Sequence, residues 1–198
     1  WPLGIPAGSL FGKLRDWMGF ENIALLVHDD PGLLEDMIRT MGDLSVTMLS
    51  RALKIARDNG VTFDHASMWE DMCFNQGPIM GPRYVEKWMK PHYCRIAELL
   101  RSYGCNYIVL DCDGKIDELI PIWLDAGVNV MFPLEIGNWD ADPIGYRKRF
   151  GKTMRIMGGF DKHILAQPKE CITAEVERLS PTVEEGGFIP FCDHRVPA

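Results

Sequence analysis

Short apolar runs alternate along this chain with longer stretches in which apolar residues recur every three or four positions. Five of the runs end on an acid or a histidine, and a helical pattern follows four of them. Apolar runs of about four to eight residues are typical of buried strands. Strands that are joined by helices lie parallel in one sheet. The pattern therefore predicts an α/β fold with a parallel sheet, and its runs begin at Val61, Tyr107, Val128, Met154 and Phe188.

The clearest helix is predicted over residues 31–59. Asp30 can cap its start, Pro31 suits its first turn, and Gly60 suits its end. A second helix is predicted over residues 84–103, with a kink or a restart at Pro91 because proline lacks an amide hydrogen. The apolar stripe of the first helix consists of Leu34, Met37, Met41, Leu44 and Met48.

The remaining pattern completes a series of strands and helices. Further helices are predicted over residues 116–126, 143–150 and 168–185, a strand over residues 61–66, and a long loop over residues 68–82. Residues 1–11 fit one more strand, which would bring the number of strands to six.

Six such strands predict most of a (β/α)8 barrel. A complete barrel has eight strands and usually about 250 residues. This chain has 198 residues, so we expect a partial barrel, roughly its third to eighth strands, folded as a single domain over residues 1–198. Open sheet edges pair readily with other strands, and we therefore expect a homo-oligomer.

Composition excludes several classes of partner. The net charge of −7 argues against nucleic acid and against an anionic membrane surface as partners. The sequence contains neither an apolar run of about eighteen residues, as a membrane span needs, nor a signal-peptide pattern. The 6 cysteines lie far apart without a CxxC pair, which is typical of reduced thiols. A cytoplasmic protein with a small-molecule substrate is the expectation.

The polar residues at the strand ends are the candidates for chemistry. In parallel barrels the active site lies at the carboxyl ends of the strands. We therefore expect the residues that end these runs to converge around one mouth. They are Asp64, Asp111, Asp113, Glu135, Asp161 and His194.

His194 and the two aspartates that follow the Tyr107 run are the leading candidates. A histidine directly after a strand can hold or transfer a proton near neutral pH; alternatively, it ties the last strand to its neighbour. Asp111 and Asp113 lie two residues apart, which places both side chains on one side of a strand. Paired acids push their pKa values apart and can then donate and accept protons, or they can bind a cation. Alternatively, Asp113 caps the helix near residue 116 and Asp111 is a buried hydrogen-bonding group.

Single acids at the other strand ends carry less information. Glu135 and Asp161 end two strands, and Glu70 and Asp71 follow Trp69 in the predicted loop. Each can equally be a helix cap or a loop anchor. Their number suggests substrate-binding groups at the same mouth.

At these residues the sequence resembles the uroporphyrinogen decarboxylase superfamily, which includes the corrinoid-linked methyltransferases. The resemblance covers nearly the whole chain and implies a (β/α)8 barrel. The segments that carry it are Trp69-Glu70-Asp71, Gly77-Pro78, Pro91 with Tyr93, Asp113-Gly114, Gly127-Val128-Asn129-Val130, Pro133-Leu134-Glu135, Phe150-Gly151-Lys152, Gly158-Gly159-Phe160-Asp161, and Gly186-Gly187-Phe188-Ile189 before His194.

The resemblance implies first a decarboxylase that acts on a tetrapyrrole or a related substrate without a cofactor. In that reading His194 is the active-site histidine and handles protons with Asp113, while Asp71 is a polar substrate contact. The family's carboxylate-binding arginines and its pyrrole-binding aspartate belong to an N-terminal part that this segment lacks. We therefore expect the segment alone to be inactive as a decarboxylase.

The resemblance implies, as an alternative, a methyltransferase that uses a corrinoid and a zinc-activated thiol. The family's zinc signature is His-x-Cys followed by a distant Cys, whereas this chain has Asp111-x-Asp113 with Cys192 near the third position. Carboxylates with Cys192 or His194 could hold a metal, although oxygen ligands make a poorer thiolate-activating zinc site. A non-catalytic member that binds a corrinoid or a partner is a third reading. A phosphate-binding barrel enzyme, suggested by Gly158-Gly159, is the last.

Overall fold

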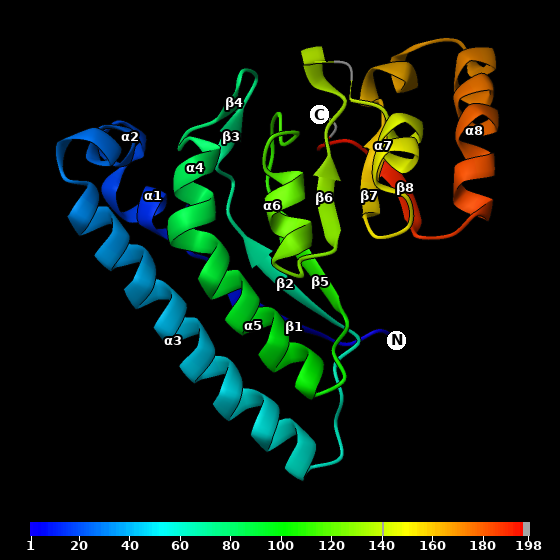
Figure 1. Ribbon diagram of the computed structural model, residues 1–198. Coiled ribbons are helices and arrows are strands. Elements are labelled where there is room, and N and C mark those ends of the chain that lie inside the picture. Colours follow the sequence, from blue (N-terminus) through cyan, green and yellow to red (C-terminus); the bar gives the residue numbers. More distant parts are fainter. Residues whose placement is uncertain (140, 196–198) are drawn as a thin grey trace.

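One parallel sheet organises the molecule. The computed structural model describes residues 1–139 and 141–195 (Figure 1). Its 6-stranded sheet has the order β1-β2-β5-β6-β7-β8, and every neighbouring pair is parallel. This confirms the predicted α/β fold. The strands are β1 (Gly4–Gly8), β2 (His65–Trp69), β5 (Tyr107–Asp111), β6 (Val130–Leu134), β7 (Arg155–Phe160) and β8 (Phe188–Cys192).

Helices connect the strands and cover one face of the sheet (Figure 1). β1 and β8 form the two edges, and the association of copies through them stays a prediction. Within the described residues, no helix has both the length and the apolarity to cross a bilayer. The α-helices are α1 (Gly12–Met18), α2 (Phe20–Asp29), α3 (Pro31–Asp58), α4 (Pro82–Tyr84), α5 (Lys90–Ser102), α6 (Ile120–Asp125), α7 (Pro143–Phe150) and α8 (Lys169–Glu184).

Helix α3 confirms the predicted bounds and corrects the predicted stripe. The side chain of Asp30 accepts a hydrogen bond from Leu33 N at 3.0 Å, as an N-cap does. Leu44 and Met48, predicted to be buried, are 51% and 57% exposed. Gly42 explains the difference, since a Cβ there would lie 2.4 Å from the His92 ring of α5. The close contact with α5 requires a small residue at Gly42, and this shifts the buried stripe of α3. The stripe consists of Leu34, Ile38, Met41, Gly42, Ser45, Leu49 and Leu53.

Pro91 restarts its helix as predicted. A π-helix over Val85–Met89 precedes α5, and Pro91 lies in the first turn of α5. A π-helical turn uses hydrogen bonds between residues five apart in place of four, and here it directly precedes the turn in which Pro91 has no N–H group to donate.

Two further predictions about the first half of the chain are wrong. The strand predicted over residues 61–66 is β2, which begins only at His65. Val61, Thr62 and Phe63 instead line a small cavity at the ends of α3 and α5, beside Leu53 and Tyr103. A short apolar run beside helix ends thus looks like a strand in sequence. The predicted loop over residues 68–82 contains a short hairpin, β3 (Cys73–Phe74) with β4 (Gly77–Pro78).

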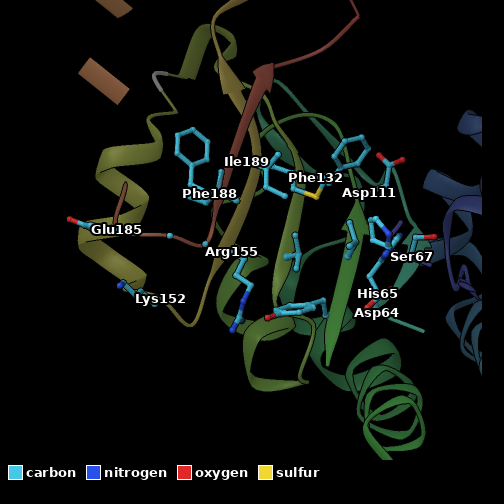
Figure 2. A pocket seen from close by; sticks show the side chains of 18 residues that line it. Asp64, His65, Ser67, Asp111, Phe132, Lys152, Arg155, Glu185, Phe188 and Ile189 are labelled. Carbon is cyan, nitrogen blue, oxygen red and sulfur yellow. The ribbon is translucent and has the colours of Figure 1, made fainter. Parts of the chain in front are cut away.

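The other face of the sheet is concave and carries a groove of about 820 Å³ (Figure 2). Alternate residues of each strand point to opposite faces. In β5 the side chains of Ile108 and Leu110 are buried in the core, while Val109 and Asp111 line the groove. This alternation places the carboxyl group of Asp111 on the inner face, at the carboxyl end of β5 (Figure 2).

Candidate functional site

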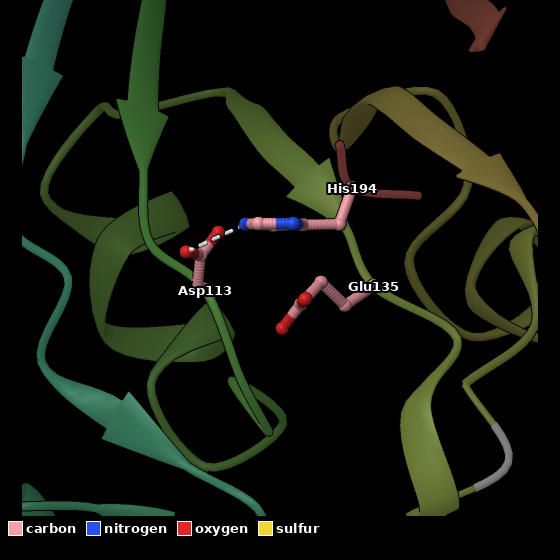
Figure 3. A group of neighbouring side chains, drawn as sticks. All are labelled: Asp113, Glu135 and His194. Carbon is pink, nitrogen blue, oxygen red and sulfur yellow. Dashed lines mark hydrogen bonds and ion pairs between the residues drawn. The ribbon is translucent and has the colours of Figure 1, made fainter. Parts of the chain in front are cut away.

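Three titratable side chains meet beyond the carboxyl ends of the strands (Figure 3). Asp113 follows β5, Glu135 follows β6 and His194 follows β8. One nitrogen or oxygen atom of each lies within 4.8 Å of those of the other two. His194 Nε2 and Asp113 Oδ2 are 3.3 Å apart, and both side chains are 39% exposed. The predicted convergence is therefore confirmed for these three residues.

The backbone around Gly114 directs Asp113 and Glu135 toward each other. Gly114 has a φ of +89°, and a Cβ at this position would lie 2.8 Å from the carbonyl group of Cys73. Only glycine fits this close turn without strain. Gly114 N donates a hydrogen bond of 2.6 Å to Glu135 Oε2. Asp113 therefore does not cap the following helix, which begins only at Ile120.

The carboxyl groups of the mouth hold their protons more tightly than ordinary acids. Burial raises the pKa of Asp111 to about 6, with smaller contributions from the charges of Asp113 and Asp71. Burial and the charge of Asp71 also raise the pKa of Asp113, against the opposing effect of His194. The pKa of Glu135 is raised by burial, although the hydrogen bond from Gly114 N opposes it. The mouth can therefore donate a proton near neutral pH.

Arg15 joins the site from helix α1 and was not found by sequence reasoning. Its guanidinium donates a hydrogen bond of 2.5 Å to the Asp71 carbonyl oxygen and pairs with the Asp71 carboxylate. Asp71 has a φ of +40°, a conformation that non-glycine residues adopt mainly where the surroundings impose it. Asp71 N also lies 3.3 Å from the Asp111 carbonyl oxygen, so Asp71 lies beside Asp111, and its predicted contact with substrate stays a prediction.

Glu70 has a structural role in place of the predicted contact with substrate. Its side chain is fully buried. The carboxylate accepts hydrogen bonds from Leu10 N, Phe11 N and Gly12 N at 2.9, 2.7 and 3.2 Å. Burial raises the pKa of Glu70, and these three donors oppose the rise. Glu70 thereby fixes the start of α1, the helix from which Arg15 reaches Asp71.

Two predicted members of the mouth are not part of the cluster. Asp64 precedes β2 instead of ending it, and its carboxylate accepts a hydrogen bond of 2.7 Å from Leu3 N. It lies at the opposite end of the sheet, because His65 pairs with Tyr107 while Trp69 pairs with Asp111.

Asp161 does follow its strand, but its carboxylate turns to His163. It accepts hydrogen bonds from the backbone N and ring Nδ1 of His163 at 2.9 and 2.7 Å. Asp161 thus caps the 3-10 helix Lys162–Ala166, which is the simple capping role allowed for it in sequence. The adjacent Gly158 and Gly159 lie within β7 itself. A Cβ on Gly158 would come within 2.7 Å of Leu134 N, so this glycine permits close strand packing.

The chain is similar to known proteins in sequence and in fold. A sequence model of one protein family, described as uroporphyrinogen decarboxylase (URO-D), matches residues 9–197. The chain belongs to the uroporphyrinogen decarboxylase family. No curated protein matches the sequence of this chain significantly.

Among solved structures, a methyltransferase from Methanosarcina mazei has a similar fold. Its TM-score is 0.67 and its identity 16%, over 96% of this chain and 52% of that one. The chain thus spans about half the length of that protein. The shared fold confirms that this member of the uroporphyrinogen decarboxylase family forms part of a (β/α)8 barrel.

The zinc centre of the methyltransferase branch does not fit the donor atoms of this mouth. Asp113, Glu135 and His194 offer two oxygens and one nitrogen, and the described cluster includes no sulfur. Thiolate and imidazole ligands suit the zinc that activates a thiol, whereas carboxylates suit harder cations.

Proposed function

We propose that this protein carries out acid–base chemistry of the carboxy-lyase type on a tetrapyrrole or a related substrate. The observation that carries the proposal is the convergence of Asp113, Glu135 and His194 beside Asp111, whose pKa burial raises to about 6. Membership of the uroporphyrinogen decarboxylase family supports it.

Decarboxylation of an acetate side chain on a pyrrole needs protons in two places. Protonation of the ring lets it accept the electron pair of the breaking carbon–carbon bond, and the methylene carbon takes up a proton after CO2 leaves. The ring then releases its proton, so that one proton is consumed for each CO2. Asp111, whose pKa burial raises to about 6, and Asp113, whose pKa burial also raises, are the donors in our proposal. His194 lies in contact with Asp113 and restores its proton.

The charge of the mouth favours the nitrogen side of such a ring. Asp71 and Glu135 present oxygen acceptors, which match the N–H donors of pyrroles. In the described part of the chain Arg15 is committed to Asp71 and Lys162 to Asp193. Binding of the substrate's carboxylates is therefore assigned to other parts of the binding surface.

Loss of turnover in a histidine variant tests the proposal. The intact protein is incubated with uroporphyrinogen, and release of CO2 is measured. We expect His194→Ala to lower the rate by about 10²-fold or more, the usual contribution of a general acid or base. His163→Ala is the matched control, because His163 is exposed and contacts Asp161. Equal rates in wild type and His194→Ala would refute the assignment.

A metal-dependent methyl transfer is the second candidate, favoured by the spacing of the three ligand atoms in the cluster. It requires one equivalent of divalent cation, measured by elemental analysis after dialysis against manganese, which carboxylate ligands suit, and loss of that cation in Asp113→Ala. A corrinoid bound without methyl transfer, detected by its visible absorption, would instead support a binding protein. We also propose a cytoplasmic location, which agrees with six free cysteines.

A further inference from the structure

Asp193 is the buried neighbour of His194 at the end of the last strand. Its side chain is 2% exposed. The backbone N of Asp193 donates a hydrogen bond of 2.8 Å to Phe160 O, which continues the pairing of β8 with β7. The carboxylate then points between the loops that follow β6 and β7.

Three donors satisfy this carboxylate. Oδ2 accepts a hydrogen bond of 3.2 Å from Ile136 N. Oδ1 accepts from Lys162 N at 3.1 Å and lies 3.4 Å from Lys162 Nζ. A buried carboxylate is costly unless it is paired and hydrogen-bonded. Asp193 therefore holds three successive loops in one fixed arrangement.

These contacts close a ring that contains all three members of the cluster. Ile136 follows Glu135, whose Oε2 accepts from Gly114 N. Gly114 follows Asp113, which contacts His194. His194 follows Asp193 in the chain, so the ring returns to its start.

The contact between Asp113 and His194 is too weak to fix the positions of the two side chains by itself. Both side chains are 39% exposed, and their atoms are 3.3 Å apart. Exposed contacts of this kind contribute little to stability, because water competes for both groups. The geometry must therefore come from the loops, and the ring identifies the buried group that fixes them.

We propose that Asp193 is a positioning residue, which holds His194 against Asp113 and sets Glu135 beside them through Ile136. The proposal rests on the proposed function only in assuming that the cluster of Asp113, Glu135 and His194 takes part in the reaction. The arrangement itself can be tested without turnover, so failure of one claim is distinguishable from failure of the other.

The test is a double-mutant cycle read from the imidazole ring of His194. Ring 15N chemical shifts are measured at one pH near neutrality in protein labelled at histidine. In wild type, Asp113→Asn removes the carboxylate in contact with the ring and is expected to move these shifts. In the Asp193→Asn background, the amide cannot accept from both Ile136 N and Lys162 N while keeping its own donors satisfied. We then expect the effect of Asp113→Asn on the ring to be lost.

Two further variants make the outcome decisive. Glu175→Gln alters another buried carboxylate, which pairs with Arg178 on α8 and takes no part in this ring of contacts, and its background should keep the full effect of Asp113→Asn. Lys162→Met removes one of the three donors to Asp193 and alters a side chain that is 20% exposed, so it tests the ring even if Asp193→Asn does not fold. Lys162→Met should reduce, in part, the effect of Asp113→Asn on the ring 15N shifts of His194. An effect of wild-type size in whichever Asp193 or Lys162 variant folds would overturn the proposal.

Discussion

The raised pKa of Asp111 makes a direct prediction about stability. The folded protein holds this proton up to about pH 6, whereas an unfolded chain releases it near 3.8. A carboxyl whose pKa is higher in the folded state stabilises the protein below its unfolded value. That stabilisation is lost as the pH rises through the folded value. Asp111→Asn keeps the shape of the protonated acid and cannot ionise.

The size of the effect follows from the two pKa values. The interval from 3.8 to about 6 corresponds to about 3 kcal/mol. Solvent contact of this half-buried group reduces the expected value to about 1 to 2 kcal/mol. The variant should therefore be more stable than wild type by this amount at pH 7.5, and nearly equal to it at pH 4.

Urea denaturation followed by tryptophan fluorescence measures the difference. At pH 7.5 the midpoint of the variant should lie about 0.5 to 1 M above that of wild type. Glu98→Gln, an amide substitution at an exposed position of α5, should leave the pH dependence unchanged. A variant that is less stable than wild type at pH 7.5 would show that the ionised form of Asp111 is favourably bound, and would refute the reasoning.

Three further substitutions test the framework of the site. Glu70→Ala leaves three buried N–H groups without an acceptor; we expect a loss of about 2 to 4 kcal/mol in the free energy of unfolding, measured in urea, and a loss below 1 kcal/mol would contradict the structural role. The pKa of Asp113 is raised mainly by burial and opposed in part by Arg15, so Arg15→Ala should raise it further in a carboxyl 13C titration, and a fall would be inconsistent with the observed contacts. Gly114→Ala places a Cβ 2.8 Å from the Cys73 backbone at a φ of +89°; it should cost more than about 1 kcal/mol and separate Asp113 from Glu135, and a variant as stable as wild type would exclude this close turn.

Local signals in the sequence predicted much of the sheet. The runs that became β5, β6, β7 and β8 are short, apolar and bounded by turns, which is typical of strands in a parallel sheet. The polar residues directly after them therefore lie at one end of the sheet. For Asp113, Glu135 and His194 this was enough to predict their convergence.

The sequence could not show where a polar side chain points after a strand ends. Glu70 and Asp71 are adjacent and both acidic, yet the positive φ of Asp71 turns one toward α1 and the other toward the mouth. Asp64 was misplaced because the apolar run before it packs against helix ends. Arg15 was missed because α1 has only 7 residues, too few to show a helical period. Asp193 differs from its neighbour His194 by burial, which depends on loops distant in sequence.

The central claim is that neighbouring carboxyl groups at the mouth release their protons at a higher pH than ordinary carboxyl groups do, beside His194. A carboxyl 13C NMR titration of the aspartates and glutamates measures this directly. We predict that Asp111 titrates at about pH 6, and that His194→Gln raises the pKa of Asp113, because the imidazole opposes the effect of burial there. Ordinary titration of both aspartates near pH 4, unchanged in His194→Gln, would contradict the account.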